Sequence, residues 1–340
     1  MTPPPVTRRM PIVIAMFALM VVAIVLSPLV GSTHISLFKA FDRSIPFAGN
    51  VDAQIFFIAR LPRALAAALV GGTLAAAGVI FQGLLRNPLA TPYTLGVSTG
   101  SALGAMLAIT FGASLPTVFG HALPAVGVTT ASLAGSLVAV LIVYLLARAR
   151  HAGLSTTVLL LAGVTLNAFF SALILFVEYL SDFAQTFRAM RWLMGNLDVV
   201  GYGPLLGALP FIGLSFIVFA WLARPLNLLS LGADAAATRG VAVRSVHRWA
   251  FFSGSIATGA AVAVGGPIGF VGIIVPHLVR LIVGSDHRLV LPASTFLGAG
   301  FLVACDTLAR IVLAPLELPV GVITAMIGGP FFLWMLIRKR

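Results

Sequence analysis

Charged residues are scarce in this sequence. Asp, Glu, Lys and Arg together make up 9% of its 340 residues, whereas soluble globular proteins carry about 25%. Only two lysines occur, Lys39 after Phe38 and Lys339 after Arg338, and neither stands in the Gly-Lys-Ser/Thr context of a P-loop. The chain therefore cannot hydrolyse ATP through a P-loop of its own, so active transport by it needs an ion gradient or a separate ATPase.

The sequence has only one cysteine and no closely spaced pair of histidines. The single Cys305 excludes an intramolecular disulfide. None of the six histidines has a second one four positions away, the spacing that places two ligands on one helix face. We therefore predict no metal centre, no cofactor, no axial heme ligand and no catalytic constellation.

Apolar residues dominate the composition. They make up 60% of the chain, and the mean hydropathy is +1.09. A bilayer-spanning helix needs roughly 20 mostly apolar residues. Ten such blocks are present, near 11–31, 59–82, 93–113, 121–147, 154–180, 203–223, 247–265, 267–283, 289–313 and 320–337. The sequence thus predicts an all-α membrane protein with a single polytopic domain over 1–340, and its small residues Gly71, Gly72, Ala75 and Gly78 predict close helix packing.

The basic residues predict the orientation in the membrane. With both termini in the cytoplasm, seven of the 21 lysines and arginines fall outside (Lys39, Arg43, Arg60, Arg63, Arg188, Arg191 and Arg310) and the remaining fourteen inside. The first block is predicted to be retained, because no small-x-small cleavage site follows it. The net charge of +12 is spread over many short loops, which argues against a nucleic-acid partner.

Several motifs interrupt the apolar pattern. The stretch from Arg60 to Gly104 contains R-L-P-R (Arg60 to Arg63), G-x-x-x-Q (Gly78 to Gln82) and R-N-P-L-A-T-P-Y-T-L-G-V-S (Arg86 to Ser98). Further on stand F-V-G-I-I-V-P-H-L-V-R (Phe270 to Arg280), G-S-D-H-R (Gly284 to Arg288) and E-L-P-V-G (Glu317 to Gly321). Together these motifs resemble the FecCD/BtuC-type permeases of bacterial ABC importers, which carry iron-siderophores, heme or cobalamin across the inner membrane.

The resemblance implies a BtuC-like, type II importer fold and a homodimer in the inner-membrane lipid bilayer. It also implies two cytoplasmic ATPase subunits and a periplasmic substrate-binding protein. By the same resemblance, Arg60, Arg63 and Arg310 would dock that binding protein. The residues Asn87, Leu89, Thr156 and Thr157 would line a cytoplasmic gate.

The long inner loop at about 224–248 is the expected coupling segment. It contains L-G-A-D-A-A-A-T-R-G-V (Leu231 to Val241), which resembles the segment that binds the ATPase in this family. The implied contact residues are Leu231, Gly232, Asp234, Ala235, Arg239 and Gly240. Ala233 stands where the family usually has an acidic residue, and Asp234 follows it.

The residues leave several alternatives open. Outer arginines also snorkel to lipid phosphates, Ser and Thr at a helix start are also N-caps, and the long loop is also compatible with a solvated connection. An ion-gradient-driven carrier would need an acid such as Asp306 or Glu178 within the membrane. Since Arg310 lies four residues after Asp306, a local ion pair explains that carboxylate equally well. The substrate stays open among ferric siderophore, heme and cobalamin.

Overall fold

The computed structural model describes residues 9–31, 33–42, 44–112, 127–149 and 156–338, and within these ranges the chain forms helices without any strand. The predicted all-α class is confirmed. Within the described residues each predicted apolar block overlaps one long helix: α1 (Met10–Leu26), α4 (Leu61–Leu85), α5 (Val97–Phe111), α6 (Val128–Ala149), α7 (Thr156–Tyr179), α9 (Gly203–Leu229), α11 (Val243–Gly265), α12 (Val271–Val283), α13 (His287–Ile311) and α14 (Val320–Arg338). Residue 113 and the ranges 121–126 and 154–155 of the predicted blocks lie outside the described residues.

Six stretches of the described residues are long and apolar enough to cross a membrane, and they contain α1, α4, α6, α7, α9 and α13. The apolar stretches in α5, α12 and α14 are shorter, so ten membrane crossings remain a prediction. The longest stretch, Val51–Leu85, has 35 residues. It includes the short helix α3 (Val51–Gln54), a π-helical turn (Ile55–Arg60) and α4.

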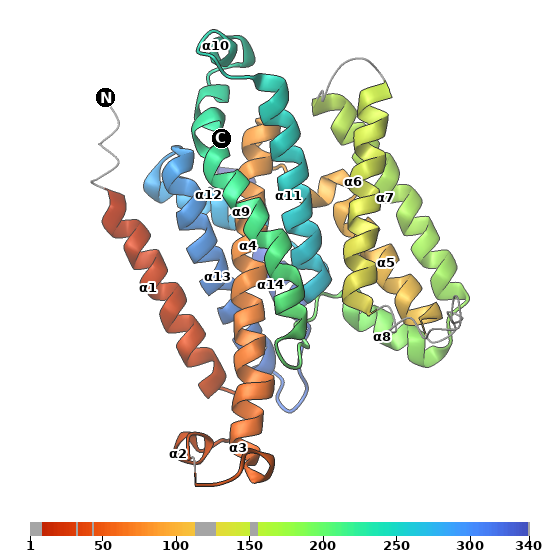
Figure 1. The fold of residues 1–340 in the computed structure, drawn as a ribbon, viewed down its shortest axis with the longest axis vertical. Helices are drawn as coiled ribbons and strands as arrows, with labels where there is room; N and C mark the ends of the chain where they lie inside the picture. Colours follow the sequence, from red (N-terminus) through yellow and green to blue (C-terminus); the bar gives the residue numbers. More distant parts are fainter. Residues whose placement is uncertain (1–8, 32, 43, 113–126, 150–155, 339–340) are drawn as a thin grey trace.

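The helices form two groups that stand side by side (Figure 1). One contains α5, α6 and α7 with the short helix α8 (Phe183–Leu193), and the other contains the remaining long helices. The short helices α2 (Leu37–Ala40), α3 and α8 lie at one end of the molecule, and α10 (Ala233–Ala237) lies at the opposite end. We call these the α8 end and the α10 end. By the predicted topology, the α8 end faces outward.

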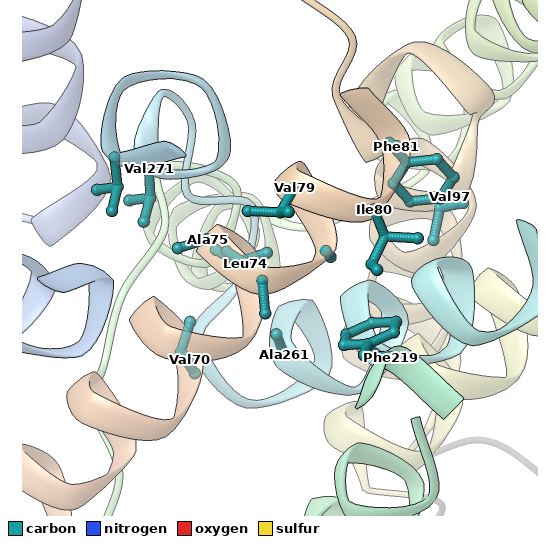
Figure 2. Packing of buried hydrophobic residues seen from close by; sticks show 14 of the residues in the cluster. Val70, Leu74, Ala75, Val79, Ile80, Phe81, Val97, Phe219, Ala261 and Val271 are labelled. Carbon is teal, nitrogen blue, oxygen red and sulfur yellow. The ribbon is translucent and has the colours of Figure 1, made fainter. Parts of the chain in front are cut away.

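Helix α4 runs through the middle of the larger group, and its small residues let its neighbours approach closely. A Cβ on Gly71 would lie 2.3 Å from the carbonyl oxygen of Gly298 in α13, and one on Gly78 would lie 2.1 Å from that of Gly272 in α12. Figure 2 shows the buried side chains that surround this helix, among them Phe219 of α9 and Ala261 of α11. The predicted packing role of the Gly71–Gly78 stripe is confirmed.

The break between α11 and α12 begins at Gly265-Gly266-Pro267, where the predicted blocks 247–265 and 267–283 meet. Gly266 has φ +67°, and Phe270, immediately before α12, has φ +68°. A Cβ at Gly266 would lie 2.5 Å from the carbonyl oxygen of Trp192. Glycine at this position therefore permits both the positive φ and the close approach of the last turn of α8.

Two boundaries differ from the sequence prediction. Helix α9 continues through Pro225 to Leu229 instead of ending near 223, and α11 begins at Val243. The predicted loop 224–248 therefore shrinks to Ser230–Ala242. Proline has no backbone N–H, so one carbonyl oxygen of the preceding helical turn loses its hydrogen bond. In a membrane protein neighbouring groups can bind that carbonyl oxygen, so the helix continues past the proline.

Helix α8 was not predicted, because its arginines place it below the hydropathy of a spanning block. Its start has a capping box: Asp182 accepts from the Gln185 N–H at 2.7 Å, and the Gln185 side chain accepts from the Asp182 N–H at 2.9 Å. The D-x-x-Q spacing is a sequence signal that could have identified this helix.

Candidate functional site

A cluster of charged side chains lies near the end of α4 that faces the α8 end. Arg63 of α4 donates from Nε to both carboxylate oxygens of Asp306 in α13, at 3.0 and 3.2 Å. Its Nη1 donates to Oε2 of Glu317, in the turn before α14, at 2.6 Å. The Nε of Arg310 lies 3.2 Å from Oδ2 of Asp306, near enough for an ion pair although it is not aimed for a hydrogen bond. The predicted Asp306–Arg310 pair is confirmed, and Arg63 joins it from another helix.

The remaining donors of the cluster hold the segment that follows α1. Arg310 donates to the carbonyl oxygens of Val30 and Ser27, at 3.0 and 3.2 Å, and to the Ser27 hydroxyl at 2.7 Å. Arg60 donates to the carbonyl oxygens of Pro28, at 3.1 Å, and of Thr33. The guanidinium groups thus join α1, α4 and α13 at one end of the bundle.

The three arginines predicted to dock a binding protein therefore lie together, but they face inward. Arg60, Arg63 and Arg310 are only 8%, 9% and 4% exposed, and Asp306 is fully buried. Only the side chain of Glu317, at 41%, opens to the surface. In this conformation the arginines bind internal oxygens, and their docking role stays a prediction.

The polar turn after α4 is tightly organised. Arg86 ends the helix in the left-handed region with φ +46°. The Asn87 side chain then accepts from the Leu89 N–H at 2.9 Å, which closes an Asx turn. Both Asn87 and Leu89 are exposed. The turn leads into a 3-10 helix (Pro92–Leu95) before α5.

This 3-10 helix is held from two sides. Asn167 of α7 donates to the Tyr93 carbonyl oxygen at 3.0 Å, and the Tyr93 hydroxyl donates to the Ile268 carbonyl oxygen in the α11–α12 break. Sequence reasoning missed Asn167, although it is the only carboxamide in the apolar block 154–180. Thr156 is the first residue of α7 and Thr157 is exposed. Their role in a cytoplasmic gate stays a prediction.

The segment Ser230–Ala242 projects at the α10 end (Figure 1). It turns at Gly232 (φ +118°) and Gly240 (φ +81°), on either side of α10. Ala236 is fully buried, and the Val241 N–H donates to its carbonyl oxygen at 3.1 Å. The side chain of Leu231 is 61% exposed, and Asp234 and Arg239 are exposed as well. A compact turn with an outward leucine and charges of both signs presents a surface on which another protein can bind.

A polar network anchors the base of this segment to α13. Asn227, near the end of α9, donates to Asp286 at 2.6 Å, and its oxygen accepts from the His287 N–H at 2.8 Å. Asp286 caps α13 by accepting from the Arg288 N–H at 3.0 Å and pairs with the Arg288 side chain at 2.9 Å. Hydrogen bonds from Arg288, and then from Asn227, lower the pKa of Asp286 to about 2 against the opposing effect of burial. The G-S-D-H-R motif thus fixes the joint between α9 and α13.

Residues 19–338 match the model of the FecCD transport family. The chain belongs to this family. It is 40% identical to the hemin transport system permease protein HmuU of Yersinia pestis, over 91% of this chain and 92% of that protein. It is 40% identical to the cobalamin import system permease protein BtuC of Halobacterium salinarum, over 87% and 77%. It is 39% identical to the Fe(3+) dicitrate transport system permease protein FecD of Escherichia coli, over 86% and 88%.

The fold agrees with this membership of the FecCD family. A solved structure of a metal-chelate type ABC transporter in an inward-facing conformation superposes with a TM-score of 0.82 at 32% identity, over 96% of this chain and 99% of that one. The family resemblance stated from the motifs is therefore confirmed. The homologues are permease subunits of ABC transporters, which implies a transport role for the chain rather than catalysis.

Proposed function

We propose that this chain is the membrane-spanning permease subunit of an ATP-binding-cassette importer that moves an iron chelate, a ferric siderophore or heme, across the bacterial inner membrane. The family match over residues 19–338 carries this proposal. Cobalamin is an alternative that the relatives support equally. The functional unit would be a homodimer with two ATPase subunits inside and a substrate-binding protein outside.

The segment Ser230–Ala242 would receive the ATPase. It projects from the bundle, it is held compact by its own backbone bonds, and the Asn227–Asp286–His287 network ties its base to α13. A force on Leu231 or Arg239 would therefore reach α9 and α13 directly. ATP-driven closure of the ATPases would move this segment and open or close the pathway between Asn87, Leu89, Thr156 and Thr157.

An ion-gradient-driven carrier is the second candidate, because Asp306 is buried within a membrane-spanning helix. Its carboxylate, however, already faces two arginines. A proton relay needs an acid that a proton can reach and leave, whereas Asp306 is fully buried and its carboxylate is occupied by Arg63 at 3.0 Å and Arg310 at 3.2 Å. The described contacts therefore support a structural role for this acid.

Uptake into proteoliposomes tests the proposal. The vesicles contain this chain and its candidate ATPase, with binding protein and substrate outside and ATP inside. A ferric siderophore, heme and cobalamin are compared, each with and without an ionophore. We expect ATP-dependent uptake of one substrate, and the ionophore should not change its rate. Uptake that does not depend on ATP and that the ionophore abolishes would refute the proposal and favour the secondary carrier.

A further inference from the structure

A cleft of about 620 Å³ lies at the α8 end, where α8 and the neighbouring ends of α5 and α6 meet the chain after α8 and the end of α11. Its volume falls within the range of small-molecule sites, about 300–1,000 Å³. Its lining includes Thr129, Arg188, Arg191, Trp192, Asn196 and Val264. The cleft lies within one chain, between the two groups of helices, and the proposed gate and coupling residues are not part of it.

The spacing along α8 explains why two arginines reach this cleft. Ala189 is buried at 1% exposure, and Gln185 is tied to α5 through a hydrogen bond to the Thr110 carbonyl oxygen at 3.1 Å. These contacts fix the rotation of the helix. Arg188 and Arg191 are three residues apart, so they lie on one side of it, and both line the cleft.

The cleft carries an excess of positive charge. Arg191 pairs with Asp198 at 3.3 Å, but the two side chains are 49% and 62% exposed. Water screens such a pair strongly, so Arg191 is available to a better partner. No hydrogen bond or ion pair of Arg188 is found among the residues that the structure describes. Two guanidinium groups thus face one carboxylate, beside an indole ring and an aliphatic wall that includes Val264.

We propose that this cleft binds a carboxylate-bearing metal chelate, with its carboxylates on Arg188 and Arg191 and its apolar body against Trp192 and Val264. Guanidinium groups bind carboxylates through charge-assisted, often bidentate, hydrogen bonds. The proposal rests on the proposed transport function and narrows it. It favours chelates with free carboxylates, such as ferric dicitrate or hemin, over corrinoids, whose periphery carries carboxamides. A lipid phosphate offers similar oxyanion chemistry, and the experiment separates it.

Equilibrium dialysis of radio-iron-labelled ferric dicitrate tests this site, using the full chain in nanodiscs of neutral phosphatidylcholine. Saturable binding is expected, and Arg188→Gln is expected to raise the Kd about tenfold or more, because one charge-assisted contact is lost. Arg191→Gln should act in the same direction. Arg148→Gln, an exposed arginine at the other end of α6, is the matched control and should leave the Kd unchanged. Each variant must elute as the wild type does in size-exclusion chromatography.

Three results would overturn the inference. The first is that the wild-type chain shows no saturable binding of ferric dicitrate, and the second is that Arg188→Gln binds it with the same Kd as the wild type. The third is that phosphatidylglycerol in the nanodiscs abolishes the binding, which would assign the cleft to a lipid headgroup. The uptake assay separates this inference from the proposed function. ATP-dependent uptake of cobalamin that Arg188→Gln leaves unchanged would refute the carboxylate site and leave the permease function intact. Binding without ATP-dependent uptake of any substrate would do the reverse.

Discussion

Replacement of Asp306 by alanine tests the role of the charge cluster. Asp306 is fully buried and accepts two hydrogen bonds from Arg63, while Arg310 lies 3.2 Å away. Its removal leaves two guanidinium groups, each less than a tenth exposed, without their shared carboxylate. Breaking a buried ion pair from one side costs about 3–5 kcal/mol. We expect the free energy of unfolding of Asp306→Ala to fall by about that amount.

Two other acids in the described structure serve as controls. Glu317 also binds Arg63, but its side chain is 41% exposed, so water replaces much of the lost contact and a smaller effect is expected for Glu317→Gln. Asp198 pairs with Arg191 on the surface, and Asp198→Ala is expected to cost at most about 1 kcal/mol. The order of effects should therefore be Asp306, then Glu317, then Asp198.

Unfolding of the purified chain by SDS in mixed micelles measures these differences. The double variant Asp306→Leu with Arg310→Met should recover part of the loss, because it replaces a charge and its partner by apolar groups. If Asp306→Ala unfolds no more easily than Asp198→Ala, the cluster does not hold α4 and α13 together and the reasoning fails.

Three further predictions concern packing, pH and coupling. Gly78→Ala should lower the free energy of unfolding in SDS by about 1–3 kcal/mol, because the added Cβ would lie 2.1 Å from the Gly272 carbonyl oxygen. Gly207→Ala is the control, since an added Cβ there would have no atom within 4 Å. An equal effect of the two substitutions would contradict the packing argument. Asp286 has its pKa lowered to about 2, so its stabilising contribution is complete above its ordinary pKa of about 3.9 and is lost as pH falls through 2. Stability measured from pH 5 to 2 should therefore fall more in the wild type than in Asp286→Asn, and parallel curves would refute this. Leu231→Glu should weaken binding of the ATPase about tenfold in a pull-down titration without altering unfolding, and unchanged binding would exclude Leu231 from the coupling surface.

The sequence predicted the features that depend on near neighbours. The apolar blocks located the long helices, and the small residues Gly71 and Gly78 marked the faces on which α4 packs. The Asp306–Arg310 pair followed from a four-residue spacing. Each of these features involves residues close together in the sequence of one helix, so composition and spacing are sufficient to detect it.

Contacts between distant segments were not predictable in this way. Arg63 and Asp306 are 243 positions apart, and no local pattern joins them. For the same reason, the inward orientation of Arg60 was not predicted. The hydrogen bond from Asn167 to the Tyr93 carbonyl oxygen before α5 was not predicted either. The extension of α9 through Pro225 was missed because the sequence rule treats proline as a helix end.

The charge cluster also has a consequence for how the chain is made. Asp306 follows Arg63 by 243 positions in the chain. Because a ribosome adds about 5–20 residues per second, Asp306 is synthesised about 10–50 s after Arg63. An arginine costs about 2.5–3.5 kcal/mol at the centre of an inserting helix. Arg63 is the third residue of α4, so its cost is below that value, and during that interval it has no carboxylate from α13. We expect α4 to wait with Arg60 and Arg63 near the membrane surface and to settle only when α13 arrives. The last third of the chain would then complete the insertion of its first.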